Sequence, residues 1–336
     1  MKHSHQWHDP RWTEVLCGQM TDRERLGLPN SYVEFSLSKA VAAAYGGLLG
    51  IGVDELHQLF VSPGAALAER IACGDLLGLA GDRRLVTHLP EMMEIAGGEI
   101  EIGLPAADVD QVLEDFSGLG LDRSWIQKEC PRHKINIPAY RIAKYPVTHQ
   151  EYRDFLLATG YPELPSSWNF RQFPQALANH PVYTISPVAV EAYIAWLVKT
   201  TGRKFRLPSE AEWEWAAAGA EAREFPWGAG FDPGRANTAE TGLMRSTPVG
   251  AFVDGASPFG LMDMAGNVEE YVADNYAAYP GGEFVADHLI QIHGEYRVAR
   301  GGSFARFRDL ARTRRRHGHN PRSATYAMGF RLAESI

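Results

Sequence analysis

The sequence predicts an α+β protein in which a small helical segment precedes a larger and more irregular domain. Residues 1–90 are rich in alanine and leucine, and their apolar residues recur at intervals of three and four, which is typical of amphipathic helices. Residues 91–336 combine short alternating stretches with dense glycine, proline, tryptophan and tyrosine, which indicates short strands joined by long loops. We therefore expect two units, 1–90 and 91–336.

Composition narrows the class of protein. The 336 residues suffice for two domains, and the formal net charge of -8 argues against nucleic-acid partners and against an anionic membrane surface. No apolar run approaches the roughly 20 residues of a membrane span, and the polar start lacks a signal-peptide core, so we expect a cytoplasmic protein. Cys17, Cys73 and Cys130 lack metal-ligand spacing and predict reduced thiols. The oligomeric state stays open.

Three or four short helices are expected in the first unit, with glycine and proline marking the breaks between them. They fall within NSYVEFSLSKAVAAAYGGLLG at 30–50, GVDELHQLFVSP at 52–63 and GAALAERIACGDLLGLAGD at 64–82. Asn30 or Ser31 can cap the first of these helices because both side chains accept hydrogen bonds from free backbone N–H groups.

The second unit begins with strands and continues with three helices. Alternation in MMEIAGGEIEIG (92–103) and INIPAYRIAKYPVT (135–148) predicts strands. Helix starts are marked by polar caps with a matched residue close behind, namely Thr148 with Glu151, Ser186 with Pro187, and Ser209 with Glu212. Trp213 and Trp215 point to opposite sides of the third helix, so at least one belongs to the core. Beyond residue 225 we expect loops and short strands.

The stretch GLMDMAGNVEEY (260–271) has the composition of a cation site. Asp263 and Glu270 can supply carboxylate oxygens, while a tight turn aims the carbonyls of Gly266 and Val268 at the same point. Hard oxygen ligands from a loop are what Ca²⁺ prefers. The alternative is an ordinary turn in which Asp263 caps and Glu270 joins a surface ion pair.

Positive charge gathers in RGGSFARFRDLARTRRRHGHNP (300–321), where Asp309 is the single carboxylate. If residues 312–317 form a strand, Arg312, Arg314 and Arg316 share one face and Arg315 lies on the other. Such arginines suit a carboxylate or phosphate ligand. The alternative is a solvated charged face.

Several ordered phrases after residue 91 together resemble the formylglycine-generating enzyme (sulfatase-modifying factor) family. They are IAKYPVTHQEYRDFL, HPVYTISPVAVEAYIAWL, RKFRLPSEAEWEWAAAGA, FPWG, GLMDMAGNVEEYVAD, RVARGGSF and MGFRLA. The resemblance implies an irregular C-type-lectin-like α+β domain with little regular secondary structure. It also implies structural calcium at the 260–271 loop, and a second calcium site using Asn237 and the carbonyl of Thr238.

One departure from the family removes its default chemistry. Copper-dependent members carry two cysteines after GGS, and a thiolate pair suits Cu(I). The matching positions here are Arg306 and Ala311, and no cysteine follows Cys130, so copper at that site is not expected. The resemblance places Arg306 in the family's substrate groove. It also places Glu269 where an aromatic residue is usual, as a metal ligand, a base or an ion-pair partner of Arg306.

Other branches of the family leave iron open as a cofactor. The chain is also similar to the iron-dependent sulfoxide synthases, which join such a domain to a helical bundle carrying an HxxxHxE iron motif. The DELHQLF stretch around His57 does not match that motif, and His88 is the other interior histidine of the helical segment. A third branch, the pyoverdine-maturation oxidases, also lacks the cysteine pair. The ligands of any iron are therefore not identified.

Two functions remain. The first is a non-copper oxidoreductase or tailoring enzyme acting on a small anionic amino acid or peptide, with Arg306, Arg314 and Arg315 holding the substrate. Ser303, Glu269 and His317 would line its pocket, and His317 is a candidate general base because the unperturbed pKa of histidine lies near neutrality. The second is a non-catalytic binding or partner module, because a fold does not determine a function. A groove in which Glu269 and Arg306 are paired favours the module.

Overall fold

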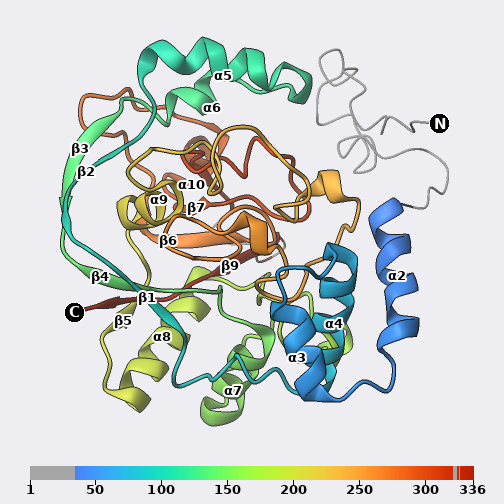
Figure 1. Ribbon diagram of the computed structural model, residues 1–336. Coiled ribbons are helices and arrows are strands. Elements are labelled where there is room, and N and C mark those ends of the chain that lie inside the picture. Colours follow the sequence, from blue (N-terminus) through green and yellow to red (C-terminus); the bar gives the residue numbers. More distant parts are fainter. Residues whose placement is uncertain (1–34, 321–323, 325) are drawn as a thin grey trace, which may run out of the picture.

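The computed structural model describes residues 35–320, 324 and 326–336, and all structural statements below refer to these. The candidate caps Asn30 and Ser31, and Cys17, lie outside the described residues. The predicted α+β class is confirmed: short helices surround two four-stranded sheets and a separate two-stranded ribbon (Figure 1).

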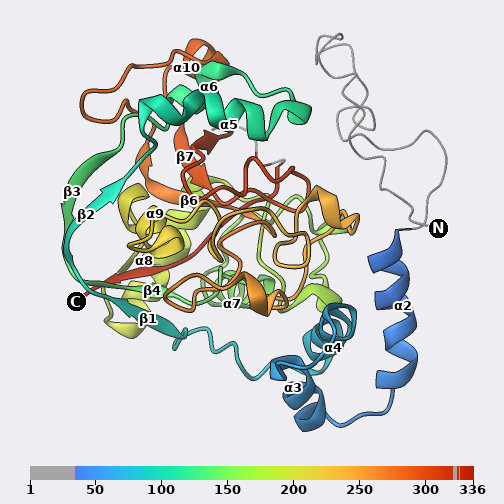
Figure 2. The same cartoon turned by 45° about the horizontal axis from the view of Figure 1, so that its top comes forward.

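The expected N-terminal helices form, as α2 (Ser36–Leu48), α3 (Val53–Val61) and α4 (Leu67–Ala80). Figures 1 and 2 show them grouped at one end of the molecule, with α2 outermost. Phe60 and Leu77 are buried between these helices together with Ala251 and Phe252 of the larger unit, so both units contribute to one apolar cluster. The helical segment is therefore packed against the larger domain.

Polar side chains fasten α4 to the larger unit. The side-chain nitrogen of Asn179 donates to the Gly74 carbonyl (2.8 Å) and to Asp82 (2.9 Å). The His180 ring lies 3.0 Å from Asp75 through Nε2 and 3.0 Å from the Ser246 hydroxyl through Nδ1. Because these groups are buried, each depends on its partner for the hydrogen bonds that water would otherwise supply.

The predicted strands divide between separate sheets. One sheet has the order β1-β4-β10-β5, a two-stranded ribbon pairs β2 with β3, and the other sheet has the order β8-β7-β6-β9, in which β6 and β9 run parallel. The bounds are β1 Met92–Ile95, β2 Gly98–Ile102, β3 His133–Ile137, β4 Tyr140–Ala143, β5 Phe205–Arg206, β6 Glu269–Asn275, β7 Arg297–Arg300, β8 His317–Gly318, β9 Met328–Phe330 and β10 Ala333–Ser335.

Both predicted capping boxes are present, and they start α7 and α9. Ser186 caps α8 with Pro187 at its first position, as expected. Sequence reasoning missed three short helices. The bounds are α5 Val109–Asp115, α6 Arg123–Gln127, α7 His149–Thr159, α8 Pro187–Thr201, α9 Glu210–Ala218 and α10 His288–His293.

The core prediction for the tryptophans is confirmed. Trp213 is fully buried and Trp215 is partly buried against the same cluster. The indole N–H of Trp213 donates to Glu270 at 2.7 Å, which ties α9 to β6. Strand β6 crosses the centre of the molecule in Figure 1, and Glu269 is its first residue. This strand and the neighbouring β7 and β8 position the site described next.

Candidate functional site

Glu269, Arg306 and His317 come together, although they lie in β6, a loop and β8. Arg306 Nε donates to Glu269 Oε1 at 3.3 Å, and His317 Nδ1 lies 2.5 Å from Glu269 Oε2. The Glu269 side chain is 1 % exposed, whereas those of Arg306 and His317 are 28 % and 25 % exposed. We call these three residues the Glu269 cluster: one buried carboxylate holds two partly exposed groups.

Charge within the cluster favours ionised Glu269. Burial by itself would raise the pKa of Glu269, but neighbouring His317 and Arg306 outweigh it and lower this pKa to about 2. Burial lowers the pKa of His317, although the Glu269 carboxylate opposes that effect. Near neutral pH the cluster therefore holds an ionised glutamate, a charged arginine and a neutral imidazole.

Two aromatic rings complete the surroundings of the cluster. The guanidinium of Arg306 lies over the ring of Tyr326, 4.6 Å from its centroid, and the ring of His319 contacts Tyr326 at 3.9 Å. Nε2 of His319 is buried and has no hydrogen-bond partner among the described residues. Sequence reasoning did not single out Tyr326, because nothing in the local sequence indicates that it stacks on a residue twenty positions earlier.

The strand considered for residues 312–317 does not form over most of that length. Only His317–Gly318 pair as β8, and residues 304–314 form successive turns. Their arginines are fixed by carboxylates distant in sequence: Arg312 pairs with Glu129 and Glu224, and Arg316 pairs with Glu210 through two hydrogen bonds of 2.8 Å. Burial of these ion pairs, rather than strand pairing, determines the local backbone.

Arg314 and Arg315 do not join the Glu269 cluster. Arg314 pairs with Glu224 at 2.9 Å and with a backbone carbonyl, and Arg315 donates to the carbonyls of Trp125 (3.3 Å) and Arg316 (3.2 Å). Both side chains are largely buried. The guanidinium groups of Arg314 and Arg315 thus donate hydrogen bonds to oxygen atoms of the protein. Of the three predicted substrate-binding arginines, Arg306 alone reaches the Glu269 cluster.

Ser303 lies beside the cluster and is buried. Its carbonyl accepts a hydrogen bond from the Arg306 backbone N–H at 2.9 Å, so Ser303 closes the turn that carries Arg306. Gly302 precedes it with φ of +68°, and a Cβ there would lie 2.9 Å from the Leu310 carbonyl carbon. The turn thus requires glycine at this position.

The positions that match the copper cysteines cannot form a thiolate pair. Ala311 is fully buried in a cluster with Phe116 and Phe225. The two cysteines of the described residues, Cys73 and Cys130, lie elsewhere, and burial raises the pKa of each thiol to about 11. Both thiols therefore stay protonated at neutral pH.

The first predicted calcium site has its carboxylate oxygens in use. Glu270 accepts from Arg331 through both oxygens (2.6 and 2.7 Å) and from Trp213. Asp263 accepts from the Gly250 N–H at 2.7 Å and from the Asn267 amide at 3.3 Å. As placed, these side chains do not fit a calcium ion, because binding one would break the buried ion pair of Glu270 with Arg331.

Asn237, the predicted side-chain ligand of the second site, is also in use. The Asn237 amide donates to the Arg245 carbonyl at 3.0 Å, and the Asn237 carbonyl accepts from Asn267 at 2.8 Å. Gly266 packs so closely on Asn237 that a Cβ would lie 2.4 Å from its carbonyl oxygen, and Thr238 and Val268 are buried. Within the described part of the chain, no group of three or more His, Cys, Asp or Glu side chains could hold a metal ion. Calcium stays a prediction.

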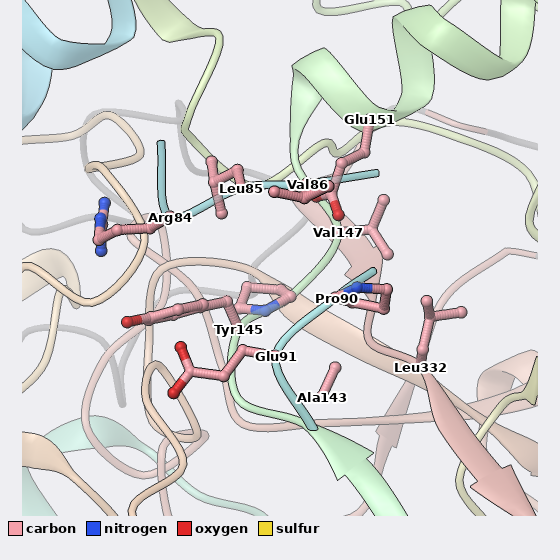
Figure 3. A pocket seen from close by; sticks show the side chains of 11 residues that line it. Arg84, Leu85, Val86, Pro90, Glu91, Ala143, Tyr145, Val147, Glu151 and Leu332 are labelled. Atoms are coloured by element: carbon pink, nitrogen blue, oxygen red, sulfur yellow. The ribbon is translucent and has the colours of Figure 1, made fainter. Parts of the chain in front are cut away.

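A small cavity lies at the junction of the two units. A cavity of about 20 Å³, the space of about one water molecule, is bounded by the linker residues 84–91 and by residues 145–147. Figure 3 shows Glu151 reaching from α7 into this space beside Val147 and Pro90. Burial raises the pKa of Glu151 to about 7, and the backbone and side chain of Thr148 donate to it without cancelling that effect.

This fold and cluster define a class of protein. Residues 80–336 match the sulfatase-modifying factor enzyme 1-like domain, and the chain belongs to that family. It is 29% identical over 278 residues to hercynine oxygenase from Mycolicibacterium smegmatis, covering 72% of this chain and 60% of that protein. It is 28% identical to the mouse inactive C-alpha-formylglycine-generating enzyme 2, covering 73% of this chain and 86% of that protein. The chain thus spans less than two thirds of the oxygenase.

A solved structure supports the same fold. PvdO from Pseudomonas aeruginosa matches with a TM-score of 0.58 and 26% identity, covering 75% of this chain and 96% of that one. The relatives thus include a protein named as an oxygenase and one named as inactive. Among the described helices, none has the length and apolar character needed to cross a membrane.

Proposed function

We propose that the protein binds a small anionic amino acid or peptide at the Glu269 cluster and acts on it as a non-copper tailoring enzyme. One observation carries the proposal: a single buried carboxylate holds a partly exposed guanidinium and a partly exposed imidazole side by side. Each of these two groups keeps nitrogen atoms that make no hydrogen bond to the described residues.

Arg306 is the anion-binding group of the proposal. Its Nε is used by Glu269 and its planar group rests on Tyr326, so the side chain is held in one orientation. The two Nη atoms then offer parallel N–H donors, which match the two oxygens of a carboxylate. Holding the guanidinium in advance reduces the entropy lost on binding.

His317 is the proton-transfer group. Because an ionised carboxylate can only accept hydrogen bonds, Glu269 fixes the proton of the neutral ring on Nδ1 and leaves a lone pair on Nε2. An imidazole oriented by a buried carboxylate is a recurrent arrangement in proton-transfer sites, where it acts as a base when neutral and as an acid when protonated. In this proposal Glu269 is a positioning residue, and Ser303 shapes the turn that presents Arg306.

Support for an oxidoreductase comes from the relatives, one of which is named as an oxygenase. A specific observation favours a second candidate, a non-catalytic binding module: Glu269 and Arg306 are paired, which partly neutralises the guanidinium. Both candidates use the same anion site, so they differ in whether the bound ligand is changed.

Binding can be tested by calorimetric titration with acetate, succinate, N-acetylglycine, glutamate and diglycine. We expect at least one carboxylate to bind, and Arg306→Gln to weaken it at least tenfold, about 1.4 kcal/mol. Arg308→Gln is a matched control because Arg308 is also partly exposed (22 %) and paired with a glutamate, Glu240, outside the cluster. Equal affinity of the two variants for every ligand would refute the anion site.

Catalysis is tested on the ligand that binds. It is incubated with the protein in air, with and without a reductant, and its mass is followed over time. A change that His317→Gln abolishes supports the tailoring enzyme, while an unchanged mass under all conditions supports the binding module.

A further inference from the structure

Resting on the proposed anion site, we infer that a carboxylate ligand binds together with one proton, which is taken up by His317. The ligand would then accept hydrogen bonds from Arg306 Nη and from the newly protonated Nε2 of His317. The cluster would bind anions that accept hydrogen bonds from both donors at once more tightly than anions that reach the arginine alone.

Shared contacts carry this inference. Arg306 and His317 bind different oxygens of the same carboxylate, so a ligand at Arg306 also lies near the imidazole. The charged and titratable groups that act on His317 are Glu269 from β6, Arg306 and Arg315 from the preceding loop, and His319 beyond β8. Without a ligand, burial opposes a positive charge on His317, and Arg306 and Arg315 add to that effect, although Glu269 opposes it and Asp309 pairs with Arg315 at 3.8 Å.

A bound anion reverses this balance. It adds a negative charge beside Arg306, at the exposed edge of the cluster, and this charge favours an imidazolium at His317. The bound anion also supplies a hydrogen-bond acceptor for the N–H at Nε2 of His317. This N–H has no acceptor among the described residues. A proton on His317 therefore becomes favourable when the anion is present, and by linkage the anion binds more tightly when that proton is available.

The direction of the pH effect follows. Burial lowers the pKa of His317 in the free protein, and a ligand raises it. Affinity is therefore constant below the pKa of the free protein and falls as pH rises above it, by up to about tenfold per pH unit, until the pKa of the complex is passed. The pKa of His319 is lowered by burial to about 4, so that ring stays neutral throughout.

The test is calorimetric titration of the full chain with the tightest carboxylate of the panel above, at one pH near 7.5 in two buffers of different ionisation enthalpy. The difference in heat gives the number of protons taken up, which we expect to lie above zero and to be at most one for the unmodified protein. His317→Gln should bind with no proton uptake, while His319→Gln should retain it. Proton resonances of the His317 ring, followed against pH with and without ligand, report the same shift without any variant.

The outcomes separate the two proposals. Binding without proton uptake by the unmodified protein overturns this inference and leaves the anion site standing. Uptake that disappears in His319→Gln but persists in His317→Gln also overturns it, since the proton then resides on the other ring. No binding of any carboxylate overturns the proposed function itself.

Discussion

Replacing Glu151 by glutamine should remove a pH dependence from the stability of the protein. The carboxyl group of Glu151 is buried, accepts hydrogen bonds of 2.7 Å from both the backbone and the hydroxyl of Thr148, and has no cation paired with it among the described residues. Burial raises its pKa from 4.5 to about 7. The folded protein therefore keeps this proton at pH values where the unfolded chain has lost it.

The sign and size of the effect follow from that difference. The contribution of Glu151 to the free energy of unfolding is fully present below the pKa of 4.5 in the unfolded chain. It is lost as pH rises through the pKa of about 7 in the folded protein. The difference corresponds to about 3 kcal/mol of unfolding free energy. Glutamine keeps an oxygen for the capping box but carries no charge, so its stability should not fall over this range. At pH 8 the variant should exceed the unmodified protein by up to about 3 kcal/mol.

Urea unfolding of both proteins, at intervals between pH 4.5 and 8.5, measures the prediction. Glu212→Gln is the matched control, because Glu212 forms the other capping box but pairs with Arg206. That variant should be less stable at every pH in the range. A stability difference between Glu151→Gln and the unmodified protein that stays constant from pH 5 to 8 would show that the carboxyl group is hydrated or paired, contrary to our reasoning.

Three further predictions concern the framework. Gly302→Ala should destabilise the protein by about 1–3 kcal/mol, since φ is +68° and the added Cβ meets backbone, and this is read from chemical unfolding. Arg331→Met should cost about 3–5 kcal/mol in the same assay, because it leaves Glu270 buried without its cation, and a loss under 1 kcal/mol would contradict that. Asn179→Leu removes the hydrogen bonds that hold Gly74 and Asp82, so limited proteolysis should cut the linker 81–91 faster in this variant. Gln175→Leu is the control, because it loses only one long hydrogen bond and should not speed the cleavage.

How much the sequence revealed depended on the range of the interactions. Helices α7 and α9 were predictable because each is specified by a cap and a glutamate three residues apart. A strand over 312–317 does not form for most of that length, and Arg312 and Arg316 there bind carboxylates about 90 to 180 residues away. No local pattern records those partners.

The site divides in the same way. The composition of the arginine-rich loop, and the glutamate at a position where the resemblance implies an aromatic residue, identified Glu269, Arg306 and His317 as candidates. The contact of Arg306 with Tyr326, and the burial of Arg314 and Arg315, depend on how loops cross in space. A side chain's availability to a ligand is decided by tertiary packing, which residue type and spacing do not encode.

The order of strands in the sheets has a consequence for synthesis on the ribosome. Strand β10 lies between β4 and β5, and β9 runs beside β6, so residues 328–335 are needed to complete both four-stranded sheets. While the chain is being made, the partners of these strands must wait, exposed, until residue 335 has left the exit tunnel. A chaperone that shields unpaired strand edges would therefore be needed longest by strands β4, β5 and β6 of the nascent chain.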